Sequence, residues 1–307
     1  MACLVNPTII NRHYVKIADE NNEPVENYSN RIDYYVNVPC RRCVNCVRSY
    51  MTYWRNRLLY EFEYMSSDAR RNSYFFTLTF DTKYYRQIDF RSMDSTRSSI
   101  HSFKRKFIDR IRKSSGSAPR HWIVTEYGER KGRLHLHGFF FDVNFDIHNL
   151  DRFWKYGLVD YSQMNENTIK YCTAYITKGN EDIILPPNKV QFVFCSPGIG
   201  KSYCDDPYNI RYHHPFPGVL NPVLQNSSQY LQSLPRYFKS KIFTDDERED
   251  MTQQFFLENS DDVIPDPPYK IGKTIYTDYT LYMEACKKHV STYKKLYKPL
   301  KKSYYGK

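Results

Sequence analysis

Apolar residues recur at three- and four-residue steps in two long segments of the chain, which predicts two amphipathic helices. The first segment spans residues 47–65 and the second spans residues 100–111. Arginines and lysines stand between the apolar positions of both segments, so each helix is expected to have a basic side. Two further helices are expected at residues 150–155 and 167–178, because a glycine follows shortly after each of them and favours a helix end.

Alternation of side chains with a period of two predicts the strands. In residues 74–80, Tyr74, Phe76, Leu78 and Phe80 share one face. Residues 122–127 and 133–141 are also strand-like and are joined by a short glycine-containing turn, which predicts an antiparallel hairpin. A last strand is expected at residues 190–195. The order of strand, helix, hairpin, helix and strand predicts an α+β fold with a central, largely antiparallel sheet flanked by helices.

After Lys201 the pattern weakens, and prolines interrupt it. We therefore expect a loop-rich C-terminal extension with a helix that opens at the acidic stretch of residues 245–250. The expected organisation has three parts. Residues 1–66 form an N-terminal cysteine cluster and amphipathic helix packed on the core, residues 67–200 form the core, and residues 201–307 form a Pro-rich and helical extension with a basic tail.

Charge and aromatic content indicate a nucleic-acid partner. The 307 residues include 45 Lys and Arg against 34 Asp and Glu, a formal net charge of +11, and 29 Tyr. Such a chain suits phosphates and stackable bases, although a solvated basic surface has the same composition. No apolar run approaches the ~20 residues of a membrane span, so no membrane partner is expected. The residues expected to contact DNA are Arg48, Arg55, Lys104, Arg105 and Lys201.

The cysteines suggest a metal site near the N-terminus. Cys40, Cys43 and Cys46 are spaced by two residues, and Cys3 is the nearest spare thiol. A structural zinc ion needs four tetrahedral ligands, so these four residues form either a Zn²⁺ site or a cluster of reduced thiols. The remaining cysteines are expected to be small core residues: Cys172, Cys195, Cys204 and Cys286.

His135 and His137 lie two residues apart on a predicted strand, so both imidazoles project from the same face while Leu134 and Leu136 pack behind them. Two convergent imidazoles are a potential metal chelate. If a four-residue loop closes the hairpin, Glu126 lies opposite His135 and completes a set of two histidines and one carboxylate. A slip of one residue would remove Glu126 from this face.

A second group of reactive side chains lies on the predicted helix at residues 167–178. At about 100° per residue, Tyr171, Tyr175 and Lys178 share a narrow arc of one side. We expect this side to point outward, while Ile169, Cys172 and Ile176 face the sheet. The alternative is a helix with tyrosines at its rim, in a chain that is rich in tyrosine.

Together these two groups predict a specific reaction on DNA. A phenolate can attack a phosphodiester whose charge a metal ion neutralises, which forms a phosphotyrosine and releases a hydroxyl. Because the pKa of phenol is ~10, a nearby ammonium such as that of Lys178 would favour the ionised form. Two tyrosines permit two successive transfers, one that cuts and one that cuts again and rejoins.

Gly200-Lys201-Ser202 resembles the end of a phosphate-binding loop. The first glycine that such a loop requires is missing, since Cys195 and Ser196 stand there. We therefore do not infer an NTPase.

The order of three motifs resembles that of HUH endonucleases. These motifs are Phe76-Thr-Leu-Thr-Phe80, His135-Leu-His137 and Tyr171-x3-Tyr175-x2-Lys178. The paired tyrosines are similar to those of rolling-circle replication initiators. The cysteine cluster and Leu234-Pro-Arg-Tyr-Phe238 further resemble the initiator of the gokushovirus branch of the microvirus family. Leu134 departs from the pattern, because many relatives carry proline before the first histidine.

The resemblance implies an RRM-like HUH fold and a nick at the phage origin, with the enzyme left on the 5′ phosphate and a free 3′ hydroxyl that primes synthesis. It implies that His135, His137 and Glu126 bind Mg²⁺ or Mn²⁺, that Tyr171 and Tyr175 are nucleophiles, and that Lys178 assists them. The implied partners are single-stranded origin DNA and a host helicase and polymerase, in the host bacterial cytoplasm. Two alternatives are a non-catalytic basic protein that binds single-stranded nucleic acid and an HUH transposase or relaxase.

Overall fold

The computed structural model describes residues 8–10, 35–37, 43–128, 133–176, 191–224, 232–258, 269–271, 274–278, 281, 284–285 and 288. The chain divides into two compact units. The first unit comprises Met1–Ser49, Asn180–Leu185 and Asp266–Lys307, and the second comprises Tyr50–Gly179 and Pro186–Pro265. The predicted domain boundaries after residues 66 and 200 stay predictions.

The described part of the first unit contains two small antiparallel ladders. One joins β1 (Thr8–Ile10) to β2 (Tyr35–Asn37), and the other joins β10 (Tyr269–Ile271) to β11 (Thr274–Tyr276).

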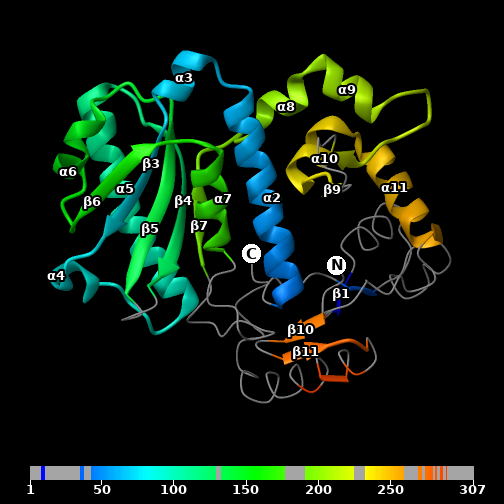
Figure 1. Cartoon of the computed structure of the whole chain (residues 1–307), viewed down its shortest axis with the longest axis horizontal. Coiled ribbons are helices and arrows are strands. Elements are labelled where there is room, and N and C mark those ends of the chain that lie inside the picture. Colours follow the sequence, from blue (N-terminus) through cyan, green and yellow to red (C-terminus); the bar gives the residue numbers. More distant parts are fainter. Residues whose placement is uncertain are drawn as a thin grey trace, which may run out of the picture. The chain divides into compact units, whose positions relative to one another are not determined.

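A five-stranded sheet is the centre of the second unit. Its strand order is β6-β3-β5-β4-β7, and all neighbours in this sheet are antiparallel (Figure 1). Helices flank the sheet, so the predicted α+β class is confirmed. The strands are β3 (Tyr74–Thr79), β4 (Arg120–Tyr127), β5 (Leu134–Phe141), β6 (Val159–Gln163) and β7 (Val193–Cys195).

One face of the sheet packs on α5 (Met93–Ser115). The Ser92 side chain accepts a hydrogen bond from the Ser95 N–H at the start of this helix, and Gly116 ends it in the left-handed conformation with a φ of 82°. The apolar side predicted from the spacing is buried, and Phe76 and Phe140 of the sheet contact Phe107 of the helix. The main apolar core therefore lies between the sheet and α5.

The other face of the sheet is covered by α2 (Val44–Glu63), from Tyr50 onward, and by α7 (Glu166–Ala174). Trp54 of α2 packs on Trp122 of β4, with 5.8 Å between the ring centroids. The two helices are joined by a hydrogen bond of 3.4 Å from Arg55 Nε to Thr173 Oγ1. Three short helices and a 3-10 turn connect the strands: α3 (Ser67–Arg71), α4 (Thr82–Tyr85), η2 (Ile147–Asn149) and α6 (Leu150–Phe153).

The region after residue 200 is more helical than its sequence pattern predicts. It contains a second apolar cluster, built from side chains such as Tyr203, Leu234 and Phe238, and Tyr60 of α2 packs against this cluster. Prolines mislead here because two of them stand at helix starts: Pro207 is the first residue of α9, and Pro235 is the residue before α10. The elements are α8 (Lys201–Asp205), α9 (Pro207–His213), β8 (Val223–Leu224), β9 (Gln232–Ser233), α10 (Arg236–Ile242) and α11 (Asp245–Glu258).

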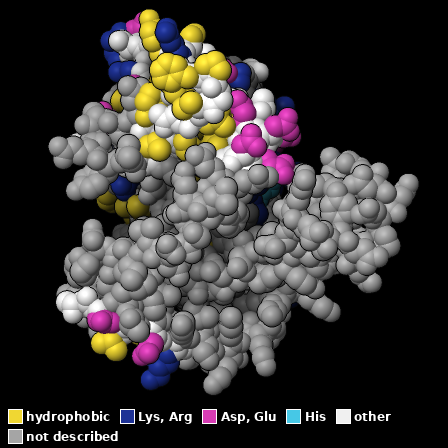
Figure 2. All heavy atoms as spheres, turned by 90° about the vertical axis from the view of Figure 1, so that its right-hand side faces the viewer, with side chains coloured by type: hydrophobic (Ala, Val, Ile, Leu, Met, Phe, Trp, Pro, Cys, Tyr) yellow, Lys and Arg dark blue, Asp and Glu magenta, His cyan; other side chains and the backbone are white. Residues whose placement is uncertain are grey.

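The surface of this region carries apolar as well as acidic side chains. Tyr208 and Phe216 are strongly exposed, and α11 has three acidic residues in its first turn. The space-filling view shows hydrophobic side chains gathered beside Asp and Glu side chains on the described part of this face (Figure 2). Among the described residues, no helix has the length and apolar character to cross a bilayer.

Candidate active site

The hairpin register brings the predicted carboxylate and imidazoles onto one face of the sheet. Glu126 of β4 is paired with His135 of β5, and Val124 is paired with His137. The predicted register is therefore confirmed. On the opposite face, Leu134 and Leu136 are buried in the core beneath α5, as expected.

Glu126 and His137 form a close pair. Glu126 Oε2 lies 2.6 Å from His137 Nε2, and both side chains are buried. Thr77 of β3 is paired with His137 across the other ladder, and its Oγ1 lies 3.0 Å from His137 Nδ1. Because an ionised carboxylate only accepts hydrogen bonds, Nε2–H donates to Glu126 and the Thr77 hydroxyl donates to Nδ1 when the imidazole is neutral. Two partners thus hold the ring in place.

His135 lies beside this pair and closer to the solvent. Its ring centroid is 6.4 Å from that of His137, with 30° between the ring planes. Gly128 follows the end of β4, and a Cβ atom at this position would lie 3.1 Å from His135 Nε2. The absence of a side chain at Gly128 therefore leaves room for the imidazole.

The donor chemistry of the site partly fits a divalent cation. Two ligands at right angles on a Mg²⁺ ion, each at about 2.1 Å, lie about 3 Å apart, so the Glu126–His137 pair would have to open by only a few tenths of an ångström. Within the described ranges, however, no group of three or more His, Cys, Asp and Glu residues is close enough to hold a metal ion. His135 as the third ligand stays a prediction.

The two tyrosines of α7 lie in different environments. Asn165 and Thr168 form a reciprocal capping pair that starts the helix, and Ile169 and Cys172 are buried against the sheet, as predicted. Tyr171 is 58% exposed, whereas Tyr175 is only 4% exposed. The expectation that both phenols point outward is thus wrong for Tyr175. The reason is that α7 ends at Ala174, so Tyr175 is its C-cap and turns toward the sheet.

Tyr175 lies against the imidazole of His137. The two rings are stacked, with 4.2 Å between their centroids and 18° between their planes. Tyr171 meets Tyr175 edge-on, with centroids 4.9 Å apart. Phe75 of β3 contacts both His137 and Tyr171, at 6.1 Å and 6.4 Å. The structure therefore brings Glu126, the two histidines and both tyrosines together at one end of α7.

Burial raises the pKa of the Tyr175 phenol, and its hydrogen bond with Tyr171 and the charge of Glu126 raise it further. The phenol is therefore kept protonated in this arrangement, contrary to the expectation of a favoured phenolate. Lys178, which was expected to provide the opposing charge, lies outside the described residues.

Sequence reasoning overlooked Thr77 and Phe75 as parts of this site. Both lie on the strand face that alternation assigns away from the core, and β3 pairs with β5. Once β3 is taken as the neighbour of β5, the face that it shares with the imidazoles identifies both residues. The signal was present in the period of two, but the strand order was not.

The residues expected to contact DNA are dispersed. Arg55 lies on α2 near α7 and is half-buried, and Lys104 and Arg105 lie on α5, across the sheet from the histidines. Arg48 is exposed, and Lys201 is exposed with an ion pair of 3.1 Å to Asp205. Of these five residues, Arg55 alone is brought near the candidate site in the second unit.

Arg57 was expected on the same open side of α2 as Arg48 and Arg55, but it is buried. Its guanidinium donates two hydrogen bonds to Ile199 O, at 3.0 Å and 2.8 Å. It also stacks on the rings of Trp54 and Tyr237, at 4.5 Å and 4.0 Å from their centroids. Cation–π contacts and carbonyl bonds replace the water that a surface arginine would bind.

The loop that resembles a phosphate-binding loop is occupied by protein groups. The Gly200 N–H donates to the Glu61 carboxylate at 2.6 Å, and the same carboxylate pairs with Arg120 at 2.8 Å. Gly200 has a φ of 78°, and a Cβ there would lie 2.9 Å from the ring of Phe238. Close packing and a left-handed backbone thus account for this glycine.

The cysteine cluster falls largely outside the described part of the chain. Cys43 is buried and Cys46 is half-buried, whereas Cys3, Cys40 and Cys286 lie outside the described residues. Cys172 and Cys204 are buried as expected. Cys195 is exposed, because it follows the buried Phe194 in the edge strand β7 and points the other way. The zinc site stays a prediction.

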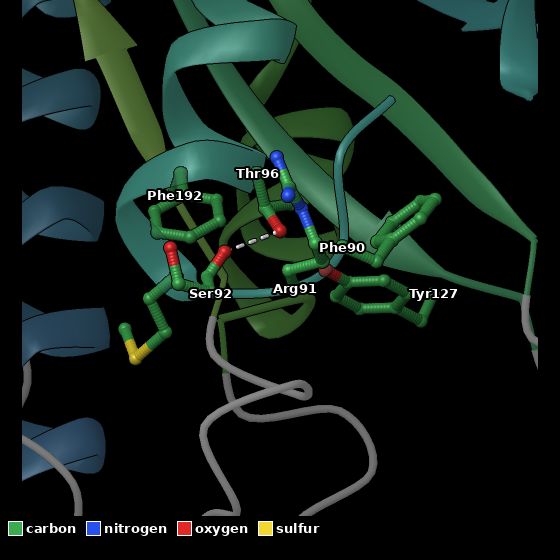
Figure 3. A pocket seen from close by; sticks show the side chains of 7 residues that line it. Phe90, Arg91, Ser92, Thr96, Tyr127 and Phe192 are labelled. Carbon is green, nitrogen blue, oxygen red and sulfur yellow. Dashed lines mark hydrogen bonds between the residues drawn. The ribbon is translucent and has the colours of Figure 1, made fainter. Parts of the chain in front are cut away.

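A small cavity of about 90 Å³ lies elsewhere, at the start of α5 (Figure 3). It is lined in part by Phe90, Arg91 and Tyr127, and Thr96 Oγ1 donates to Ser92 O beside it at 2.8 Å. Its lining includes core residues of the α5 face, so it is separate from the histidine face.

Comparisons with known proteins agree on one theme. Residues 73–180 match the family model of the Replication-associated protein ORF2, a segment that runs from β3 beyond α7 and contains the whole candidate site. The chain is also 25% identical over 314 residues to the Replication-associated protein ORF2 of Spiroplasma virus 4, and the match covers 91% of each chain. No solved structure matches the chain. These similarities support a role as a viral replication initiator.

Proposed function

We propose that the chain is a rolling-circle replication initiator that nicks single-stranded DNA at a phage origin through a covalent 5′-phosphotyrosine. The observation that carries the proposal is the buried Glu126–His137 pair packed against two tyrosines at the end of α7. The match of this segment to replication-associated proteins supports it. The further resemblance to HUH initiators of microviruses, gokushoviruses in particular, is part of the proposal.

In the proposed step a tyrosine Oη attacks the phosphorus of a phosphodiester. The P–Oη bond forms as the bond from phosphorus to the 3′ oxygen breaks, and that oxygen takes up a proton and leaves as a hydroxyl that primes synthesis. In rejoining, a 3′ hydroxyl attacks the phosphotyrosine and releases the phenol. The energy of the phosphodiester is kept in the protein–DNA bond, so no nucleotide cofactor is required.

Glu126, His135 and His137 are the residues that would hold Mg²⁺ or Mn²⁺. When bound, such an ion supplies positive charge to the phosphate oxygens of the scissile group. Thr77 fixes the Nδ1 side of His137 and so orients Nε2 toward the same point as the Glu126 carboxylate. Tyr171 and Tyr175 are the proposed nucleophiles, and Lys178 is proposed to assist them.

The proposed partners are single-stranded DNA and a host helicase and polymerase, in the cytoplasm of a bacterial host. DNA binding rests on the net charge of +11 and on basic side chains such as Arg55 and Lys104. A helicase is proposed because the loop at Gly200 is filled by Glu61.

The proposal is tested with 3′-end-labelled single-stranded oligonucleotides tiled across the replicon that encodes the chain. Each is incubated with the full-length protein and Mn²⁺ and then analysed by denaturing electrophoresis. We expect a labelled protein–DNA adduct with one or a few oligonucleotides, and its loss on chelation or in the double variant Tyr171→Phe/Tyr175→Phe. An adduct that persists in the double variant would refute the tyrosine assignment.

The second candidate is a basic protein that binds single-stranded nucleic acid without cutting it. The burial of Tyr175 favours this alternative, since a buried phenol is not ready to attack. Under this alternative the oligonucleotides bind in a salt-dependent way, but no adduct forms with any of them. A transposase or relaxase would form the adduct, but its released 3′ hydroxyl would not be extended by a polymerase in replication of the circle.

A further inference from the structure

The two tyrosines of α7 are close in sequence but unequal in access. Tyr171 is 58% exposed and Tyr175 is 4% exposed. They are four residues apart, and a regular helix would place both on one open side. The difference arises because Tyr175 is the C-cap of α7, where the backbone leaves the helix.

Tyr175 is held by the site itself. Its ring stacks on His137 at 4.2 Å between centroids and is covered on its other side by the edge of Tyr171, at 4.9 Å. A phosphodiester that approaches from solvent therefore meets Tyr171 before Tyr175. For Tyr175 to reach a phosphorus atom, its ring has to leave His137 and Tyr171 has to move aside.

Tyr171 has no comparable restraint among its ring contacts with described residues. It touches Phe75 edge-on at 6.4 Å between centroids and Tyr175 at 4.9 Å, and most of its surface faces solvent. A rotation of its side chain moves the phenol toward a bound strand without any change in the backbone.

We propose that the two tyrosines act in a fixed order, with Tyr171 making the first cut and Tyr175 the second. This inference rests on the proposed function. In the first transfer Tyr171 Oη bonds to the phosphorus and the 3′ oxygen leaves as a hydroxyl. Once Tyr171 is attached to the strand it no longer covers Tyr175, which is then free to attack a second phosphodiester while the 3′ hydroxyl released there joins to the phosphate on Tyr171.

The first cut is tested with the oligonucleotide that forms an adduct with the wild-type protein. We expect Tyr171→Phe to lower the rate of adduct formation about 10³-fold or more, as the loss of a nucleophile does, and Tyr175→Phe to leave it within a few-fold of wild type. Digestion of the wild-type adduct and mass spectrometry should find the nucleotide on the peptide that contains Tyr171, at that residue.

The second cut is tested on the isolated adduct. A second intact oligonucleotide with the same site and a different label is added after the unreacted DNA has been removed. The wild-type adduct should cut and join it, whereas the Tyr175→Phe adduct should leave it intact. Tyr208→Phe is the matched control, because it removes an exposed hydroxyl from α9, away from the site.

Three outcomes would overturn the order. They are a first adduct on Tyr175, equal first cuts by both single variants, and a second cut that survives in Tyr175→Phe. A wild-type protein that forms no adduct would instead refute the proposed function. Circular dichroism of each variant checks that it folds, and phenylalanine preserves the ring packing at both positions.

Discussion

One face of the five-stranded sheet is closed by α5 and the other by α2 and α7, and the two faces bury different side chains. Beneath α5 the contacts are mainly apolar, as between Phe76, Phe107 and Phe140. Beneath α7 a carboxylate, an imidazole and a hydroxyl are buried together, in Glu126, His137 and Thr77. Polar burial of this kind costs free energy unless every group is paired, so it marks the face that is used for chemistry.

The comparison teaches that one strand can serve both purposes. In β5, Leu134 and Leu136 face α5 while His135 and His137 face the other side, and a period of two keeps the sets apart. Stability and activity are therefore expected to respond to different substitutions on the same strand. The predictions below test this separation.

The largest effect is expected for His137→Ala. Removal of the imidazole takes away the partner of Glu126 and the ring against Tyr175, so adduct formation should fall about 10³-fold or more. Salt-dependent binding to the same oligonucleotide should remain. His148→Ala, at an exposed histidine of η2, is the control. Loss of binding together with cutting would show that His137 has a folding role instead.

On the α5 face, Phe107→Ala should act on stability alone. Phe107 is fully buried against Phe76, Phe140 and Trp154, and its truncation leaves a cavity that should cost about 3 to 5 kcal/mol of unfolding free energy. Urea unfolding measures the loss. The remaining folded protein should form the adduct at the wild-type rate, and a rate defect in excess of the folded fraction would break the separation of the two faces.

A pH dependence of stability should come from His121 of β4. This side chain is buried, and its burial lowers its pKa to about 4. The unfolded chain, with a pKa near 6.5, binds the proton first, so stability is lost as the pH falls from about 6.5 toward 4. His121→Gln should remove about 2 to 3 kcal/mol of the difference in unfolding free energy between pH 7 and pH 4.5. An unchanged difference would show that His121 is already protonated in the folded state.

The smallest effect is expected for Thr77→Val, which removes the hydroxyl from His137 Nδ1 but keeps the shape of the side chain. The ring loses one of its two restraints, so cutting should slow about 10-fold while stability falls by about 1 kcal/mol. Thr96→Val, which removes a hydroxyl on the α5 face, should cost similar stability without slowing the cut. Equal rates in the two variants would show that Thr77 does not position the imidazole.

Much of the sheet and its site could be predicted from local patterns. The pairing of Glu126 with His135 follows from the strand faces and a short turn, and the burial of α5 follows from its three- and four-residue steps. These features depend on neighbours in the sequence or on one hairpin. For that reason they are present in the periodicity.

The rest depends on contacts between distant segments. β6 was missed because it is a short edge strand with only half-buried and exposed positions, and its place is set by pairing with β3. The burial of Arg57 depends on Tyr237 and Ile199, far along the chain. Tyr175 was placed outward because the periodicity does not reveal that α7 stops at Ala174.

Helix α2 belongs to both halves of the second unit. Through Trp54 and Arg55 it touches the sheet and α7, and two turns later Tyr60 enters the apolar cluster of the C-terminal helices. Glu61 and Arg57 fasten the loop between these halves to the same helix. The reactive half is thus not a cassette that recombination can exchange by itself, because any donor fragment has to bring a compatible α2 with it.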